Sequence, residues 1–100
     1  MKKGLLDAYV LMLLSHGDTY GYKLIQDVSD VIDVSESTLY PVLRRLEGQE
    51  CLSTYNMEHG GRLRKYYRIM KGGLTKLADY RADCIELRHI IDRILERPAS

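Results

Sequence analysis

The residues that decide the fold occupy positions 37 to 47 and read STLYPVLRRLE. Their apolar members recur at the spacing of one helical face and predict a buried stripe of Leu39, Val42, Leu43 and Leu46. Pro41 breaks a helix rule, because it lacks the N–H that would bond to the carbonyl of residue 37. A local rule broken without a packing reason indicates a functional constraint. The helix, from about Ser37 to Gly48 or Gln49, is therefore the first candidate functional element.

Two helices are expected before it. Residues 5–14 are apolar almost all round and are interrupted only by Asp7, which is typical of a helix buried on most faces. The second helix is predicted from Thr19 to about Ile32, with apolar residues at helical spacing from Leu24 onward. A short turn at 33–35 would then lead into the third helix, with Ser35 and Ser37 as candidate N-caps.

Two strands are expected after it, at residues 51–57 and 63–69, where tyrosines and β-branched residues gather. Gly60 and Gly61 lie between them and can take the positive φ of a tight hairpin turn. Tyr66 and Tyr67 point to opposite sides, so one of them should enter the core. Two isolated strands are only marginally stable, so the hairpin must lean on the helices.

A long last helix is expected from about Leu74 to Arg97, ended by Pro98. Apolar residues follow a heptad spacing along it and predict a dimerisation seam of Leu77, Tyr80, Cys84, Leu87, Ile91 and Ile94. Further apolar residues widen this seam, so we expect the helix to pack on its own domain and on the same helix of a second chain. Cys84 could meet its symmetry mate, although a buried free thiol is the better interpretation.

Helix, helix, turn, helix and hairpin is the order of a winged helix-turn-helix. We therefore predict a mainly α (α+β) fold with a two-stranded wing and a long C-terminal helix. Residues 1–70 would form the DNA-binding domain and residues 71–100 the dimerisation helix. A helix on such a support fits the major groove, which is ~12 Å wide. A basic hairpin beside it can reach neighbouring phosphates.

Charge supports this interpretation only through its distribution. The net charge of the 100 residues is +1, which alone argues against a nucleic-acid partner. Residues 37–70, however, hold six Lys or Arg and three Asp or Glu, a net +3, whereas residues 1–36 have a net −3. A dimer would present the positive block twice.

Other classes of protein find little support. No apolar run approaches the ~18 residues of a membrane span, and the two cysteines, Cys51 and Cys84, suit a reducing compartment, so we expect a cytoplasmic protein. The histidines are too scattered for a metal site. No catalytic motif is found, so we expect neither an enzyme nor a cofactor.

The sequence resembles the PadR family of transcriptional regulators over about residues 4–77. The matching motifs are Gly4-Leu5-Leu6-Asp7, Tyr20-Gly21-Tyr22, residues 37–47 and Arg64-Lys65-Tyr66-Tyr67-Arg68-Ile69. The single C-terminal helix is similar to that of the shorter subfamily, in which it mediates dimerisation. The resemblance implies a dimeric repressor that binds a palindromic operator.

Two departures from the family pattern matter. Members usually place Thr after the second strand, where it can cap the last helix, and this chain has Met70 there. Some members of the short subfamily bind flat aromatic drugs between paired Trp residues at the dimer interface. This chain has no Trp, so that mode of binding does not carry over.

The candidate DNA-binding residues come from the third helix and the hairpin: Ser37, Thr38, Tyr40, Arg44, Arg62, Arg64 and Lys65. Their hydroxyls and cations suit phosphates and base edges. Plainer roles stay open: Ser37 as a cap, Tyr40 as packing, and the hairpin cations as charges that guard an edge strand. Of Arg44 and Arg45, one can face DNA while the other is solvated or pairs with an acid such as Glu47.

Two alternative functions belong to other classes. The winged helix could be a protein-interaction module, using the same wing and helix on a protein partner. The regulator could also sense a small molecule at the dimer interface, near Tyr80, Cys84 and Leu87. Nothing in the sequence names such a ligand.

Overall fold

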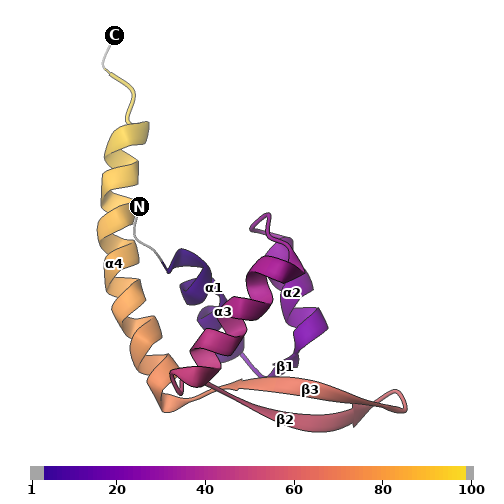
Figure 1. The fold of residues 1–100 in the computed structure, drawn as a ribbon. Coiled ribbons are helices and arrows are strands. Elements are labelled where there is room, and N and C mark those ends of the chain that lie inside the picture. Colours follow the sequence, from indigo (N-terminus) through magenta and orange to yellow (C-terminus); the bar gives the residue numbers. More distant parts are fainter. Residues whose placement is uncertain (1–3, 99–100) are drawn as a thin grey trace.

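The computed structural model describes residues 4–98. Its helices are α1 (Leu5–Ser15), α2 (Gly21–Ser29), α3 (Glu36–Gly48) and α4 (Lys71–Leu95), and its strands are β1 (Thr19–Tyr20), β2 (Leu52–His59) and β3 (Arg62–Ile69). The strands form one antiparallel sheet in the order β1-β3-β2. The first helices gather beside this sheet, and α4 rises from its base (Figure 1). The expected winged-helix order is confirmed.

The start of the second helix was predicted too early. Thr19 and Tyr20 form a short strand that pairs with Tyr67 and Tyr66 of β3, and α2 begins only at Gly21. The sheet therefore has three strands, although the wing itself is the expected two-stranded hairpin of β2 and β3. A partner strand distant in sequence overrides the helical pattern here, which local spacing cannot reveal. The helix also ends at Ser29, before Ile32.

A single apolar core joins the helices to the base of the sheet. The predicted stripe of α3 is buried as expected, and it packs with residues of α1 and α2; the fully buried side chains include Val10, Leu11, Leu14, Leu24, Val28, Leu39, Leu43, Leu46 and Leu52. Tyr67 faces this core, while Tyr66 lies on the opposite side of the sheet. Burying one such leucine stabilises the fold by about 2 kcal/mol, so the core fixes how α3 sits.

The first turn of α4 is packed closely against the turn that precedes β2. The helix begins at Lys71, earlier than predicted, and so includes Gly72 and Gly73. A Cβ on Gly73 would overlap the carbonyl oxygen of Cys51, and one on Gly72 would lie 2.9 Å from the carbonyl oxygen of Glu50. The two glycines therefore allow close backbone approach and do not separate two elements. Met70 stands at the N-cap, the place where family members usually have Thr, and it makes no side-chain cap hydrogen bond.

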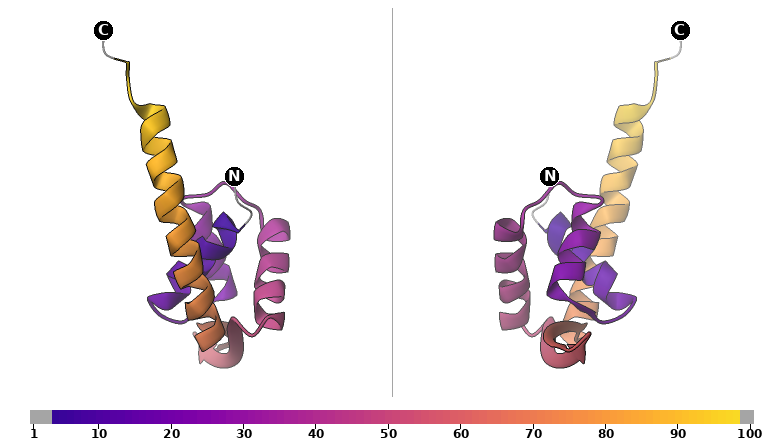
Figure 2. Two further views of the ribbon diagram at one scale, coloured as in Figure 1. Left: turned by 90° about the vertical axis from the view of Figure 1, so that its left-hand side faces the viewer. Right: turned by 90° about the vertical axis from the view of Figure 1, so that its right-hand side faces the viewer.

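The second half of α4 projects away from the rest of the molecule. Leu77 packs into the core, whereas the later turns rise past α1 (Figures 1 and 2). This projection makes the molecule elongated, with extents of 62 × 25 × 22 Å. Within residues 4–98, no helix combines the length and apolar character needed to cross a membrane.

Candidate nucleic-acid interface

The outer face of α3 is polar at its N-terminal end. Ser37 and Thr38 are exposed there, and Arg44 is exposed in the second half of the helix. Ser35 occupies the N-cap position, and its hydroxyl lies 2.9 Å from that of Ser37 and 3.3 Å from that of Thr38. Ser37 is therefore inside the helix and does not cap it. The hydroxyls form an exposed cluster that can exchange these bonds for bonds to a ligand.

A cleft of about 230 Å³ joins α3 to the start of α2 and to the wing; it is lined by Tyr20, Gly21, Tyr22, Tyr40, Arg64, Lys65 and Tyr67. Gly21 forms its narrow side, since a Cβ there would lie 3.4 Å from the Tyr67 ring and 3.6 Å from the Tyr40 hydroxyl. β1 pairs only with Tyr66 and Tyr67, so the edge of β3 is uncovered from Lys65 toward the hairpin turn. The cleft opens at this uncovered edge.

The cations of the wing lie in three different settings. Arg62 is exposed beside the turn, where Gly60 and Gly61 have φ of 60° and 79°. Arg64 stacks its guanidinium 4.4 Å from the centre of the Tyr20 ring, and its Nε is buried without a hydrogen-bond partner among the described residues. Lys65 lies on the other side of β3, with its Nζ 3.9 Å from a carboxylate oxygen of Glu47.

A row of aromatic rings supports this arrangement on the outer side of the sheet. Tyr66 contacts Tyr20 on β1 and Tyr55 on β2, with ring centres 5.7 and 5.5 Å apart. The row continues to Arg68, whose guanidinium lies 4.8 Å from the Tyr55 ring. Asp18 fixes the positions of Tyr55 and Arg68, because it accepts hydrogen bonds from the Tyr55 hydroxyl at 2.7 Å and from Arg68 Nε at 3.2 Å. The bond to Asp18 raises the pKa of the Tyr55 hydroxyl above its usual value.

Arg44 and Arg45 have different partners, as the sequence suggested, but the acid was not foreseen. Among the described residues, Arg44 has no ion pair or hydrogen-bond partner. Arg45 pairs with Asp7 of α1 and not with Glu47, with 2.6 Å between Nη2 and each carboxylate oxygen. Asp7 interrupted an apolar run, and that signal could have marked it as a buried partner for a cation.

The predicted dimerisation seam divides into two parts. Leu77 is 3% exposed in the core of its own domain, and the Tyr80 hydroxyl donates a hydrogen bond to Asp7. These first two members are therefore used within the chain. Cys84 and Leu87 are half-buried, while Ile91 and Ile94 are exposed on the projecting part of α4. An apolar groove of about 190 Å³ lies between α1 and α4, lined by Leu5, Ala8, Tyr9, Met12, Leu77, Tyr80, Arg81 and Cys84.

A supported helix with an exposed polar face, beside a cationic hairpin, defines a winged-helix regulator of the DNA-binding class. The model of the Transcriptional regulator PadR-like family matches residues 10–79, and the chain belongs to that family. The family is one of transcription regulators, so this chain is a DNA-binding regulator.

Relatives match nearly the whole chain. An uncharacterised protein of Lysinibacillus sphaericus is 36% identical over 94% of this chain and 91% of its own. The crystal structure of smu.1704 from Streptococcus mutans UA159 has a TM-score of 0.86 at 36% identity and covers 95% of this chain and 92% of its own. A PadR-like transcriptional regulator from Bacillus cereus also has a TM-score of 0.86, at 26% identity over 96% of both chains.

Proposed function

We propose that this regulator is a homodimeric repressor that binds a palindromic operator. The α3 helices of the two protomers enter successive major grooves, one helical turn or ~34 Å apart, and the wings grip the flanking backbone. The observation that carries this proposal is the cleft that joins α2, α3 and the wing, because one DNA strand can contact all three elements there.

The cleft suits a backbone phosphate. It lies at the N-terminus of α2, where amide N–H groups lack partners within the helix and the helix dipole favours an anion. Arg64 adds a buried Nε that has no hydrogen-bond partner among residues 4–98, and Lys65 adds a second cation. The hydroxyls of Tyr22 and Tyr40 can donate further hydrogen bonds.

Base recognition is assigned to the exposed side of α3. Arg44 has its donors free among the described residues, and arginine is the commonest specific partner of guanine. The hydroxyl cluster of Ser37 and Thr38 lies toward the N-terminal end of the same helix, the end that usually meets base edges. Arg62 at the wing turn would contact a flanking phosphate.

The projecting half of α4 supports the homodimer. Its large apolar side chains face solvent in the single chain, including Ile85, Ile90, Ile91, Ile94 and Leu95. Exposed apolar surface on this scale marks an interface. A second α4 packed along this half would cover Ile91 and Ile94 and continue onto the groove beside Cys84. Leu77 takes no part in this proposed interface because it is already buried in its own domain.

The experiment measures binding to duplex DNA from the region upstream of the gene, with fluorescence anisotropy as the readout. The salt concentration is varied, and unrelated duplex DNA serves as the competitor. If each protomer neutralises about four or five phosphates, log K should fall with log salt at a slope of roughly −7 to −9. Saturable binding that resists the competitor supports the operator model. No binding at low salt would shift the proposal to a protein-interaction module.

Variants of the cleft test the assignment of its cations. Replacing Arg64 and Lys65 together by Gln should make the salt slope of the dimer shallower by about 3.6, because each of the two protomers loses two phosphate contacts. Arg88→Gln is the matched control, since it removes an exposed cation from α4, outside the proposed DNA surface. If the two variants lost the same operator affinity for each charge removed, only the net charge of the protein would matter.

The groove between α1 and α4 also supports a second role, the sensing of a small molecule. Among the described residues its lining is almost wholly apolar, with Arg81 as the one charged side chain. A ligand that binds only the folded protein must raise its melting temperature. A thermal-shift screen of flat aromatic and cationic compounds therefore tests this role, and no shift across the set would count against it.

A further inference from the structure

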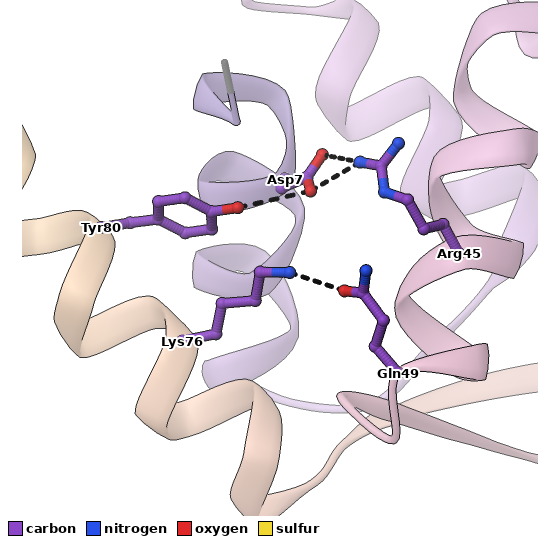
Figure 3. Close-up of polar contacts among 5 residues, drawn as sticks. All are labelled: Asp7, Arg45, Gln49, Lys76 and Tyr80. Carbon is purple, nitrogen blue, oxygen red and sulfur yellow. Dashed lines mark hydrogen bonds and ion pairs between the residues drawn. The ribbon is translucent and has the colours of Figure 1, made fainter. Parts of the chain in front are cut away.

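Three helices meet at a buried carboxylate. The side chain of Asp7, in α1, is 7% exposed and accepts a hydrogen bond at 2.6 Å on each oxygen from Nη2 of Arg45 in α3. The hydroxyl of Tyr80, in α4, approaches Asp7 Oδ2 at 3.5 Å (Figure 3). The Tyr80 ring lies close to Gly4, where an added Cβ would be 2.8 Å from it.

A second polar contact lies one helical turn away. Nζ of Lys76, in α4, donates to Oε1 of Gln49 at the end of α3, at 2.6 Å. Arg45 and Gln49 are four residues apart on one side, and Lys76 and Tyr80 are four residues apart on the other, so the two contacts form parallel bridges (Figure 3). Polar side chains therefore connect α3 to α1 and α4 alongside the apolar core.

The carboxylate depends on Arg45 for compensation of its charge. A buried charge that lacks its partner strongly destabilises the fold. Arrangements of α1 and α3 that separate Asp7 from Arg45 are therefore unfavourable. The hydrogen bond that Arg45 donates to Asp7 is also the main cause of a raised pKa at the Arg45 guanidinium. Arg45 itself is half exposed, and its Nη2 points toward Asp7 of α1 (Figure 3). Its neighbour Arg44 has no such partner among residues 4–98.

We propose that Arg45 is a positioning residue, whose ion pair with Asp7 fixes α3 relative to α1 and α4 and so controls specific DNA affinity without touching DNA. This inference rests on the proposed insertion of α3 into the major groove. In the dimer, α4 joins the two protomers, so the bridges from α4 to α3 set the separation of the two recognition helices. Operator recognition depends on that separation, whereas non-specific binding does not.

The test compares Asp7→Asn, Arg45→Gln and the double variant with the wild type. Each single variant should weaken operator binding by about tenfold, which is within the usual range of coupling between sites. The double variant should lose no more than either single variant, because both remove one interaction. The salt slope and the affinity for unrelated duplex should stay unchanged, because no phosphate contact is lost.

The rival role for Arg45 is a direct phosphate contact, and it predicts a different pattern. Arg45→Gln would then weaken binding to every duplex and make the salt slope of the dimer shallower by about 1.8, because each protomer loses one phosphate contact. Asp7→Asn would leave affinity unchanged or raise it, since a competing carboxylate is lost. Arg62→Gln is the matched control, since it removes an exposed cation proposed to contact a phosphate, and it should change the slope in this way. The rival pattern at Arg45 would overturn the inference.

Tyr80→Phe keeps the inference testable if the Asp7 variants do not fold, because it removes only one hydroxyl and keeps the ring. Thermal melts establish that the variant folds. Its operator affinity should fall two- to threefold, less than the usual effect of losing the whole coupling between two sites, and its salt slope should stay unchanged. No change in affinity would count against the bridge to α4. A wild-type protein that binds no DNA would instead reject the proposed function, so the two failures are distinguishable.

Discussion

At the scale of the residue, Gly73 has the most restricted surroundings of the glycines. Its Cα faces the backbone of Cys51, and an added Cβ would also lie 2.7 Å from Cγ1 of Ile69. We expect Gly73→Ala to lower the free energy of unfolding by about 1–3 kcal/mol, the usual cost of overpacking. Urea unfolding followed by circular dichroism measures it.

Gly48 provides the control for this prediction. It ends α3 with nothing within 4 Å of an added Cβ. Gly48→Ala should therefore leave stability unchanged or raise it by up to ~1 kcal/mol, because alanine favours the helix. Equal destabilisation by both variants would show that packing against Cys51 is unimportant.

Tyr80 makes a prediction about pH. Burial first, and then the charge of Asp7, raise the pKa of the Tyr80 hydroxyl above its usual value of 10.0. A group whose pKa is higher in the folded state contributes stability that is complete below the unfolded pKa and is lost as pH rises through the folded one. The wild type should therefore lose stability above pH ~10, and more steeply than Tyr80→Phe. Parallel melting curves for the two proteins from pH 8 to 11 would contradict this expectation.

At the scale of the element, β1 depends on aromatic contacts. It has only two residues, and Tyr66 of β3 contacts Tyr20 of β1 as well as Tyr55 of β2. Each aromatic pair contributes about 0.5–1.5 kcal/mol beyond its buried area. Tyr66→Ala should destabilise the fold by about 1–3 kcal/mol and speed amide hydrogen exchange at residues 19–20 more than at α1.

Mass spectrometry of exchanged peptides measures this effect. Met57→Ala is the matched control, since Met57 is an exposed residue of β2 on the same side of the sheet. An equal rise in exchange at α1 and β1 would mean that the aromatic row supports the whole domain and not β1 in particular.

At the scale of the whole molecule, the projecting half of α4 carries the proposed dimer. Ile94 is 73% exposed in the single chain, and a carboxylate buried in an apolar seam is strongly unfavourable. Replacing Ile91 and Ile94 together by Asp should convert a dimer into a monomer of 11.6 kDa and weaken operator binding. Light scattering after size exclusion measures the mass.

His89→Asp is the control for the dimer variant. It adds a carboxylate to the exposed part of α4 outside the heptad seam. The control should remain dimeric and bind the operator like the wild type. A monomeric wild type would reject the dimer without affecting the assignment of α3.

Apart from β1, the order of the elements followed from the sequence by itself, and so did the buried face of α3. Helical spacing from Leu39 to Leu46 predicted the buried face of α3, because the 3.6-residue period of a helix is written in local sequence. The two glycines of the wing turn and the alternation of Tyr66 and Tyr67 predicted the hairpin, because positive φ in a turn and the two-residue period of a strand are also local properties. The family motifs lie within these elements.

Only the tertiary structure decided which distant residues meet. The pairing of β1 with β3 replaced the first turn of the predicted second helix, and Asp7 took Arg45 as its partner across 38 positions of sequence. The tertiary structure also divided the heptad seam, since Leu77 lies in the core and Ile94 is exposed to solvent. Period and propensity describe one element at a time. Partners across elements are set by packing of the whole chain, because a buried charge or an unpaired strand edge is stabilised only by what lies beside it in space.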